Sequence, residues 1–492
     1  MTDNALGKGS VTITEEAFPL GRDSFDPASG PTAWLWRHVL DVLQAEREQI
    51  SARPVAPQID LARLRSAVGL YDFDEPAHPG AVIDDLVELL RDSTVHTTHP
   101  RYFGLFNPTP TLLGVVGETL AAAFNPQLAA WSHAPAAVEI EAHLLRFLGA
   151  RMGYPAAEVA GSFTSGGAEA NLTAVLLALT RMWPGYGTAG LRALPGRPVL
   201  YASAESHLAW LKIAHATGLG RDAVRLVPVN ADLRMDLEQL TARLDADRAA
   251  GDAPFLVVGT AGTTGAGVID PLPELAELCR TYGIRFHVDA AYGGVAALSD
   301  RLREALTGIE QAHSITVDAH KWLSVPMGAG ALLCTDRAGL AETFRVSTSY
   351  MPADIPDTVD PYTSSQQWSR RFAGLKLFLS LAVAGRSGYA EQLERDAELA
   401  DALRAHLRDS GWLITSNTSL PVVCFADPSP PADSWKHHTE LANSVVQSGS
   451  AWISPVRLNG HAALRACVIS HRTTPADIDA LVQAVNDARR TA

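Results

Sequence analysis

Four residues that could do chemistry fall between positions 289 and 321: Asp289, Asp318, His320 and Lys321. Both acids end apolar runs, FHVDAA and SITVDAH, which predict buried strands. The strand ends should lie together at the carboxyl edge of an α/β sheet, where such sheets bind ligands. A charged lysine is costly to bury in so apolar a segment. We therefore expect Lys321 to serve as a neutral amine or an imine.

A lysine imine beside a strand-end carboxylate suits pyridoxal phosphate. Lysine forms Schiff bases when desolvation or a neighbouring cation lowers its pKa. Asp289 could bind a protonated pyridine nitrogen through a charge-assisted hydrogen bond, which keeps the ring an electron sink. The alternatives are a surface turn at Lys321 and a structural ion pair at Asp289.

A glycine turn in TSGGAEAN, residues 164–171, could hold the phosphate. A strand ends there and a helix begins, so free amides and the positive end of the helix dipole should point at one spot. Gly166 and Gly167 allow close approach, and Ala168 adds an amide. The alternative is an ordinary strand-to-helix turn.

Three other segments could line the same pocket. His207 follows an apolar run and could stack on a flat ring, although a solvated or core histidine is the alternative. GTAGTTGAGVID, residues 259–270, brings threonine hydroxyls to the sheet edge, and Asp270 should open the next helix. HPRYFGLFNPTPTLL, residues 99–113, is an aromatic loop suited to a pocket wall.

The segments that must position these residues have the sequence pattern of an α/β fold. From residue 159, seven short apolar runs alternate with helical stretches, which predicts a mostly parallel sheet covered by helices. Residues 31–95 read as helices whose apolar faces need a partner, and a small α+β unit follows residue 375. We expect a helical segment (1–110), a large cofactor-binding domain (111–374) and a small C-terminal domain (375–492).

The composition excludes several classes of function. The net charge is −14, from 54 acids and 40 bases, without the basic clusters that nucleic acid requires. The four cysteines lack the spacing of a zinc or redox site, and we expect free thiols and no bound metal. The start of the chain has no signal pattern, and no apolar run is long enough for a membrane span. These features predict a soluble, cytoplasmic protein.

Taken together, TSGGAEAN, the His207 region, GTTGAGVID, HVDAAYGG and DAHKW resemble the group II pyridoxal-phosphate amino-acid decarboxylases over nearly the whole chain. The resemblance implies the aminotransferase fold type I with a seven-stranded sheet, and a homodimer. It implies that Lys321 forms the Schiff base, Asp289 pairs with the pyridine nitrogen and His207 stacks on the ring. Further cofactor contacts are implied for Gly166, Gly167, Ala168, Thr264, Ala291, Asp318 and His320.

Asp318 and the lid tyrosine need a separate interpretation within this resemblance. The family often has Asn where this chain has Asp318, so we expect that carboxylate to bond a backbone amide or hydroxyl and not a phosphate. A lid tyrosine should return a proton to the carbanion. In residues 348–372 we choose Tyr362 for this role, with Tyr350 as the fallback.

The implied reaction is decarboxylation of an L-amino acid to an amine and CO₂. Phe103, Phe106 and, across the dimer, His133 are candidate substrate contacts. The aromatics suit an aromatic substrate, whereas Ala129 beside His133 would suit a bulkier, polar or acidic one. The alternatives are an oxygen-using aldehyde synthase, an aminotransferase or a non-catalytic relative, and a lid tyrosine favours the amine product.

Overall fold

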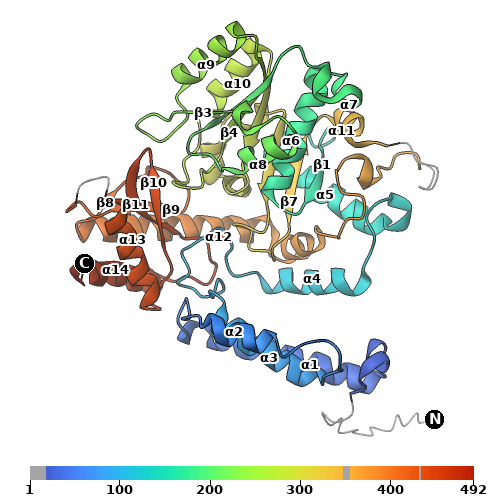
Figure 1. The fold of residues 1–492 in the computed structure, drawn as a ribbon, viewed down its shortest axis with the longest axis vertical. Coiled ribbons are helices and arrows are strands. Elements are labelled where there is room, and N and C mark those ends of the chain that lie inside the picture. The colour runs from blue at the N-terminus through green and yellow to red at the C-terminus, as the bar shows by residue number, and fades with distance from the viewer. Residues whose placement is uncertain (1–17, 347–354, 431–433, 492) are drawn as a thin grey trace.

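A seven-stranded sheet forms the centre of the computed structural model, which describes residues 18–346, 355–430 and 434–491 (Figure 1). The strand order is β1-β7-β6-β5-β4-β2-β3. Strand β7 runs antiparallel to β1 and β6, and the other neighbouring pairs are parallel. The predicted mostly parallel sheet is confirmed. The strands are β1 (Ala160–Thr164), β2 (Pro198–Ser203), β3 (Val224–Val227), β4 (Ala253–Thr260), β5 (Arg285–Asp289), β6 (Ser314–Asp318) and β7 (Gly330–Cys334).

Helices cover both faces of this sheet. On one face, α6 (Gly167–Met182) and α8 (Ala209–Ala216) pack with β2 and β4, and α11 (Arg337–Phe344) packs beside α6 on β1 and β7. On the other face lie α5 (Pro135–Arg151), α9 (Leu237–Ala249) and α10 (Leu272–Tyr282). Alternation along β4 supports this division, because Val257 belongs to one core cluster while Leu256 and Val258 belong to the other.

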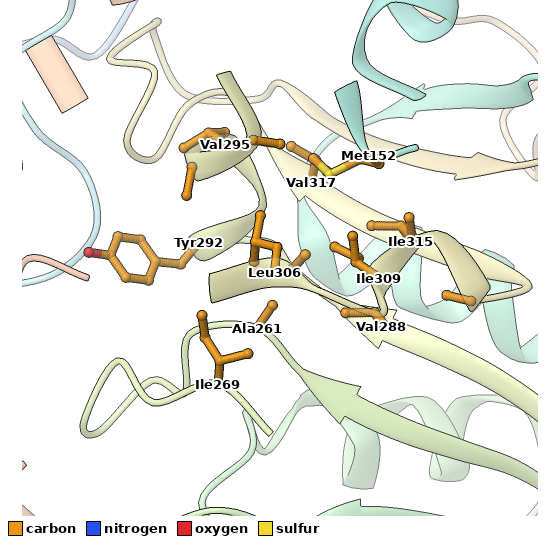
Figure 2. Packing of buried hydrophobic residues seen from close by; sticks show 14 of the residues in the cluster. Met152, Ala261, Ile269, Val288, Tyr292, Val295, Leu306, Ile309, Ile315 and Val317 are labelled. Atoms are coloured by element: carbon orange, nitrogen blue, oxygen red, sulfur yellow. The ribbon is translucent and has the colours of Figure 1, made fainter. Parts of the chain in front are cut away.

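The second face also buries three short 3₁₀ helices, η7 (Gly293–Leu298), η8 (Leu302–Leu306) and η9 (Ile309–Gln311). Figure 2 shows Leu306 and Ile309 packed near Val288 of β5 and Ile315 of β6. Successive side chains of a strand point to opposite faces. The polar residues that alternate with these aliphatic ones, Asp289 included, must therefore point to the face that carries α6.

A second, antiparallel sheet forms the C-terminal unit, in the order β10-β11-β9-β8. Its elements are α12 (Leu375–Asp409), β8 (Leu413–Ile414), β9 (Val422–Ala426), α13 (Trp435–Gln447), β10 (Ser454–Leu458), β11 (His461–Cys467) and α14 (Pro475–Thr491). Helix α12 is interrupted at Gly385, whose backbone is non-helical. Strands β9 and β11 and the long helix are confirmed, whereas β8 and β10 were not predicted.

The N-terminal helices stand apart from the α/β body as an outer layer (Figure 1). They are α1 (Ser29–Gln49), α2 (Leu61–Val68) and α3 (Pro79–Ser93), followed by α4 (Leu112–Phe124), which packs on α12. Large apolar side chains remain exposed on α1 and α4, among them Trp36, Leu40, Leu120 and Phe124. The predicted apolar faces are thus only partly covered within the described chain.

Two further sequence predictions concern the chain as a whole. The four cysteines are free and buried, as expected. Across the described residues, no helix combines the length and apolar character needed to cross a membrane.

Candidate active site

A cavity of about 310 Å³ opens at the carboxyl ends of β4, β5 and β6, where the sequence placed the site. Parallel strands bring their carboxyl ends to one edge, and the loops that follow carry the functional side chains. The predicted residues that line the cavity are Phe106, Gly166, Gly167, Ala168, His207, Thr264, Asp289, Ala291, Asp318 and Lys321.

One end of the cavity is built from the glycine turn before α6. Gly167 and Ala168 open this helix, so their amides lack intrahelical acceptors. A Cβ atom on Gly167 would lie 2.9 Å from Asp318 Oδ2 and 3.1 Å from Ala291 Cβ, so only glycine fits here. His320 lies behind the turn, 3.4 Å from where a Cβ of Gly166 would be, and accepts the Ala329 N–H at Nδ1. Burial lowers the pKa of His320.

The opposite wall carries Asp289 at the end of β5. Its Oδ2 accepts a hydrogen bond from Asn171 Nδ2 at 2.8 Å, and its Oδ1 accepts the Ala291 N–H at 3.2 Å. These two donors fix the orientation of the carboxylate. Asn171 also lines the cavity and had no predicted role. Its position four residues after Gly167, on the sheet-facing side of the predicted helix, was the available signal.

Asp318 makes a different set of contacts from the one predicted. We expected a backbone amide or hydroxyl, but Oδ2 instead lies 3.3 Å from Lys321 Nζ and 3.8 Å from His320 Nε2. The other oxygen, Oδ1, is buried without a hydrogen-bond partner among the described residues. The prediction was wrong because side chains that follow β6 turn back over the strand end, which sequence periodicity does not show.

An aromatic stack forms a third wall. The Phe106 ring stacks on Tyr292 with centroids 4.1 Å apart, and Tyr292 stacks on Trp322 at 5.5 Å. Figure 2 shows the Tyr292 hydroxyl pointing away from the aliphatic cluster. Lys321 Nζ lies 5.8 Å from the Phe106 centroid, and the Arg465 guanidinium lies 4.8 Å from it. Tyr292 and Arg465 had no predicted role.

His207 follows β2 and lines the cavity together with the charged residues Asp289 and Lys321. Its Nδ1 accepts the Ala209 N–H at 3.1 Å, which leaves Nε2 for another partner. Loss of hydration lowers the pKa of His207, opposed by Asp289 and assisted by Lys321. The ring is therefore uncharged at neutral pH and can lie against a flat ligand.

Several predicted residues lie outside the cavity. Phe103 is fully buried in the core of the C-terminal unit, so its assignment as a substrate contact is wrong. His133 is exposed and does not line the cavity of its own chain. Tyr362 is buried, stacks on Trp368 at 5.1 Å, and is likewise outside the lining. Tyr350 lies outside the described residues.

The groups around the cavity fit pyridoxal phosphate. Helix-terminal amides suit the phosphate, Asp289 suits a protonated pyridine nitrogen and Lys321 suits the aldehyde. The hydroxyl of Thr260, buried without a hydrogen-bond partner in the described chain, also lines the cavity and can meet a polar ring substituent. When bound, this cofactor supplies an electron sink for the bond that is broken.

Comparisons with known proteins agree with this fit. Residues 70–427 match the pyridoxal-dependent decarboxylase conserved domain. The chain is 28% identical over 444 residues to an aromatic-L-amino-acid decarboxylase of Bacillus atrophaeus, covering 88% of this chain and 90% of that protein. It is 31% identical over 416 residues to L-2,4-diaminobutyrate decarboxylase of Rhizobium meliloti (strain 1021), covering 82% and 81%. The structure of mouse CSAD superposes with a TM-score of 0.88 at 26% identity, covering 94% and 99%. The chain therefore belongs to the pyridoxal-dependent decarboxylase family and is a pyridoxal-phosphate-dependent amino-acid decarboxylase of fold type I.

Proposed function

We propose that the protein decarboxylates an aromatic L-amino acid to the corresponding amine and CO₂. The observation that carries this substrate class is the stacked pair Phe106 and Tyr292, which lines the cavity beside Lys321. An aromatic side chain packed against such rings gains offset-stacking contacts. Among the relatives of this chain is an aromatic-L-amino-acid decarboxylase, which supports the same choice.

An acidic amino acid is the second candidate substrate, because a buried cation, Arg465, lies over the ring of Phe106; Phe106 lines the cavity, and Arg465 itself does not. Arg465 is buried 4.8 Å from the Phe106 centroid and has no carboxylate partner among the residues that the structure describes. A buried guanidinium without a counter-ion is costly, so a substrate carboxylate would stabilise it. Among the described residues, Arg465 Nη2 donates to the Cys467 sulfur at 3.0 Å.

A substrate panel separates these candidates. The holoenzyme is incubated with aromatic, acidic and basic L-amino acids, and CO₂, amine, H₂O₂ and keto acid are measured. Fastest release of CO₂ and amine from an aromatic amino acid supports the proposal, whereas preference for an acidic one shifts it to the second candidate. H₂O₂ with aldehyde would indicate an aldehyde synthase, and keto acid without CO₂ an aminotransferase.

The residue roles follow from the cavity. We infer that Lys321 forms the Schiff base with the cofactor, Asp289 holds its pyridine nitrogen and His207 lies against its ring. Gly166, Gly167, Ala168 and His320 would hold the phosphate side, with Thr264 and Ala291 beside the ring; these roles rest on cavity geometry and on the sequence resemblance.

We propose Tyr362 as the proton donor, with Tyr350 as the fallback. In its own chain Tyr362 lies outside the cavity lining, its ring stacks on Trp368 and its backbone N–H donates to Ala129 O, so it would act in the cavity of a partner subunit. Tyr362→Phe is expected to lower amine formation at least about a hundredfold, the scale of lost general acid catalysis, and to divert product toward aldehyde and H₂O₂. Tyr350→Phe should retain the amine product. Product analysis with oxygen present checks both, and the reverse result would move the role to Tyr350.

We further propose a homodimer, in a cytoplasmic setting that the buried free thiols favour. A second copy of this chain is the expected cover for the exposed apolar stripe Leu112, Val116, Leu120 and Phe124 of α4. The nearby segment that contains Ala129 and His133 would then reach the partner's cavity.

Charges on this stripe are expected to separate the subunits. The double variant Val116→Asp/Leu120→Asp should sediment as a monomer at micromolar concentration and lose most activity, because two carboxylates would be buried without partners. Leu413→Asp is the control, since Leu413 is similarly exposed but lies on the C-terminal unit. Sedimentation velocity measures the mass, and an unchanged mass in the double variant would remove α4 from the interface.

A further inference from the structure

A buried chain of hydrogen bonds joins Asp289 to strand β6 through helix α6. Asn171 donates from Nδ2 to Asp289 Oδ2 at 2.8 Å. The Asn171 Oδ1 atom accepts from Thr316 Oγ1 at 2.7 Å and lies 3.1 Å from His287 Nε2. His287 Nδ1 lies 2.8 Å from Ser314 Oγ. All five side chains are buried. The role predicted for Asp289, which is to pair with the pyridine nitrogen, does not by itself require the polar side chains behind it.

The arrangement follows from the register of two neighbouring parallel strands. His287 of β5 pairs with Ser314 of β6, and Asp289 pairs with Thr316. Residues two apart on a strand point to the same face. The four polar side chains therefore form a patch on the face that carries α6, and Asn171 is the helix residue that meets them.

The direction of each bond is determined by the chemistry of the groups. An ionised carboxylate only accepts, so Asn171 must turn its amide N–H toward Asp289 and its oxygen toward Thr316 and His287. Thr316 then donates its hydroxyl proton, and His287 carries its proton on Nε2. Burial lowers the pKa of His287 to about 4, so the ring is neutral and Nδ1 can accept from Ser314.

We propose that Asn171 is a positioning residue for the cofactor: Thr316 and His287 fix its amide, and the amide holds the Asp289 carboxylate turned toward the pyridine nitrogen. The inference rests on the proposed pairing of Asp289 with that nitrogen. A carboxylate held by a fixed donor at Oδ2 and by the Ala291 amide at Oδ1 has little rotational freedom left. Its remaining lone pairs face the cavity that it lines.

Thr316 offers a matched pair of variants to test this role, because neither it nor His287 lines the cavity. Thr316→Val keeps the shape and removes the hydroxyl, whereas Thr316→Ser keeps the hydroxyl and removes the methyl group. The holoenzyme is prepared with cofactor labelled with ¹⁵N in the ring. The pyridine nitrogen chemical shift and the cofactor dissociation constant are then measured.

In Thr316→Val we expect the chemical shift of the pyridine nitrogen to move toward the value of the unprotonated ring. The cofactor dissociation constant should rise about tenfold, the scale of one hydrogen bond in a charged network. In Thr316→Ser the chemical shift should not change, and the dissociation constant should stay within about twofold of that of the parent protein. Asn171→Leu should move both quantities further in the same direction. If Asn171→Leu does not fold, the comparison of Thr316→Val with Thr316→Ser still tests the proposal.

A lower melting temperature in Thr316→Val with an unchanged nitrogen shift would assign the network to stability alone and overturn the inference. Equal shifts in the Val and Ser variants would overturn it as well. Asp289→Asn separates this failure from failure of the proposed pairing. If Asp289→Asn leaves the shift unchanged, the pairing itself is wrong; if it moves the shift while the Thr316 and Asn171 variants do not, only the positioning role is wrong.

Discussion

Lys321→Ala is expected to abolish the visible absorption band of the lysine–cofactor imine. It should also lower the decarboxylase activity at least about a thousandfold, as loss of a covalent catalytic group does in other enzymes. The physical reason is the position of its amine at the carboxyl edge of the sheet, 3.3 Å from Asp318 and inside the aromatic wall. No other lysine lines the cavity within the described chain, so a neighbouring amine cannot replace it.

The alanine variant also leaves Asp318 buried without its cation, so lost folding must be separated from lost chemistry. Lys321→Arg is the matched control, because it keeps a positive charge beside Asp318 but cannot form the imine. It should keep the thermal stability of the parent protein and still lack the absorption band. Lys436→Ala changes an exposed lysine and should keep both band and activity. A visible band that survives in Lys321→Arg would show that the imine forms elsewhere.

The parts of the site that could be predicted are those whose signal is local in the sequence. Asp289 and Asp318 each end an apolar run, and Gly166–Gly167 stands between a strand and a helix, so the sheet edge collects them. The alternation of strands and helices likewise predicts the parallel sheet. The antiparallel direction of β7 had a signal that the alternation pattern does not use: the segment 319–329 that joins β6 to β7 contains no helix and is short for a parallel crossover.

Other parts depend on contacts between distant segments. Phe103 and Phe106 lie three residues apart in one loop, yet Phe103 enters the C-terminal core because its backbone bonds Trp452 and Cys467. Phe106 turns instead to Tyr292. Loop side chains have no period from which these directions could be derived. The division into three domains, the homodimer and the roles of individual site residues stay predictions.

Asp289→Asn is the second change with a large expected effect, a fall in kcat/KM of about 10²–10³. The amide has the shape of the carboxylate, and its oxygen can still accept from Asn171. The variant therefore removes the charge that we propose keeps the pyridine nitrogen protonated, while disturbing the fold little. Because this charge acts on the cofactor's capacity as an electron sink, kcat should fall more than the affinity for substrate.

A chemical rescue distinguishes loss of charge balance from loss of structure. A cofactor with a methyl group on its ring nitrogen is positively charged without help from a carboxylate. In Asp289→Ala, which leaves room for that methyl group, this cofactor should restore part of the activity that ordinary pyridoxal phosphate does not. Steady-state kinetics with both cofactors measures the difference. Equal activity with the two would show that Asp289 supports the cavity wall, which its bonds to Asn171 and Ala291 already do, and does not act on the ring charge.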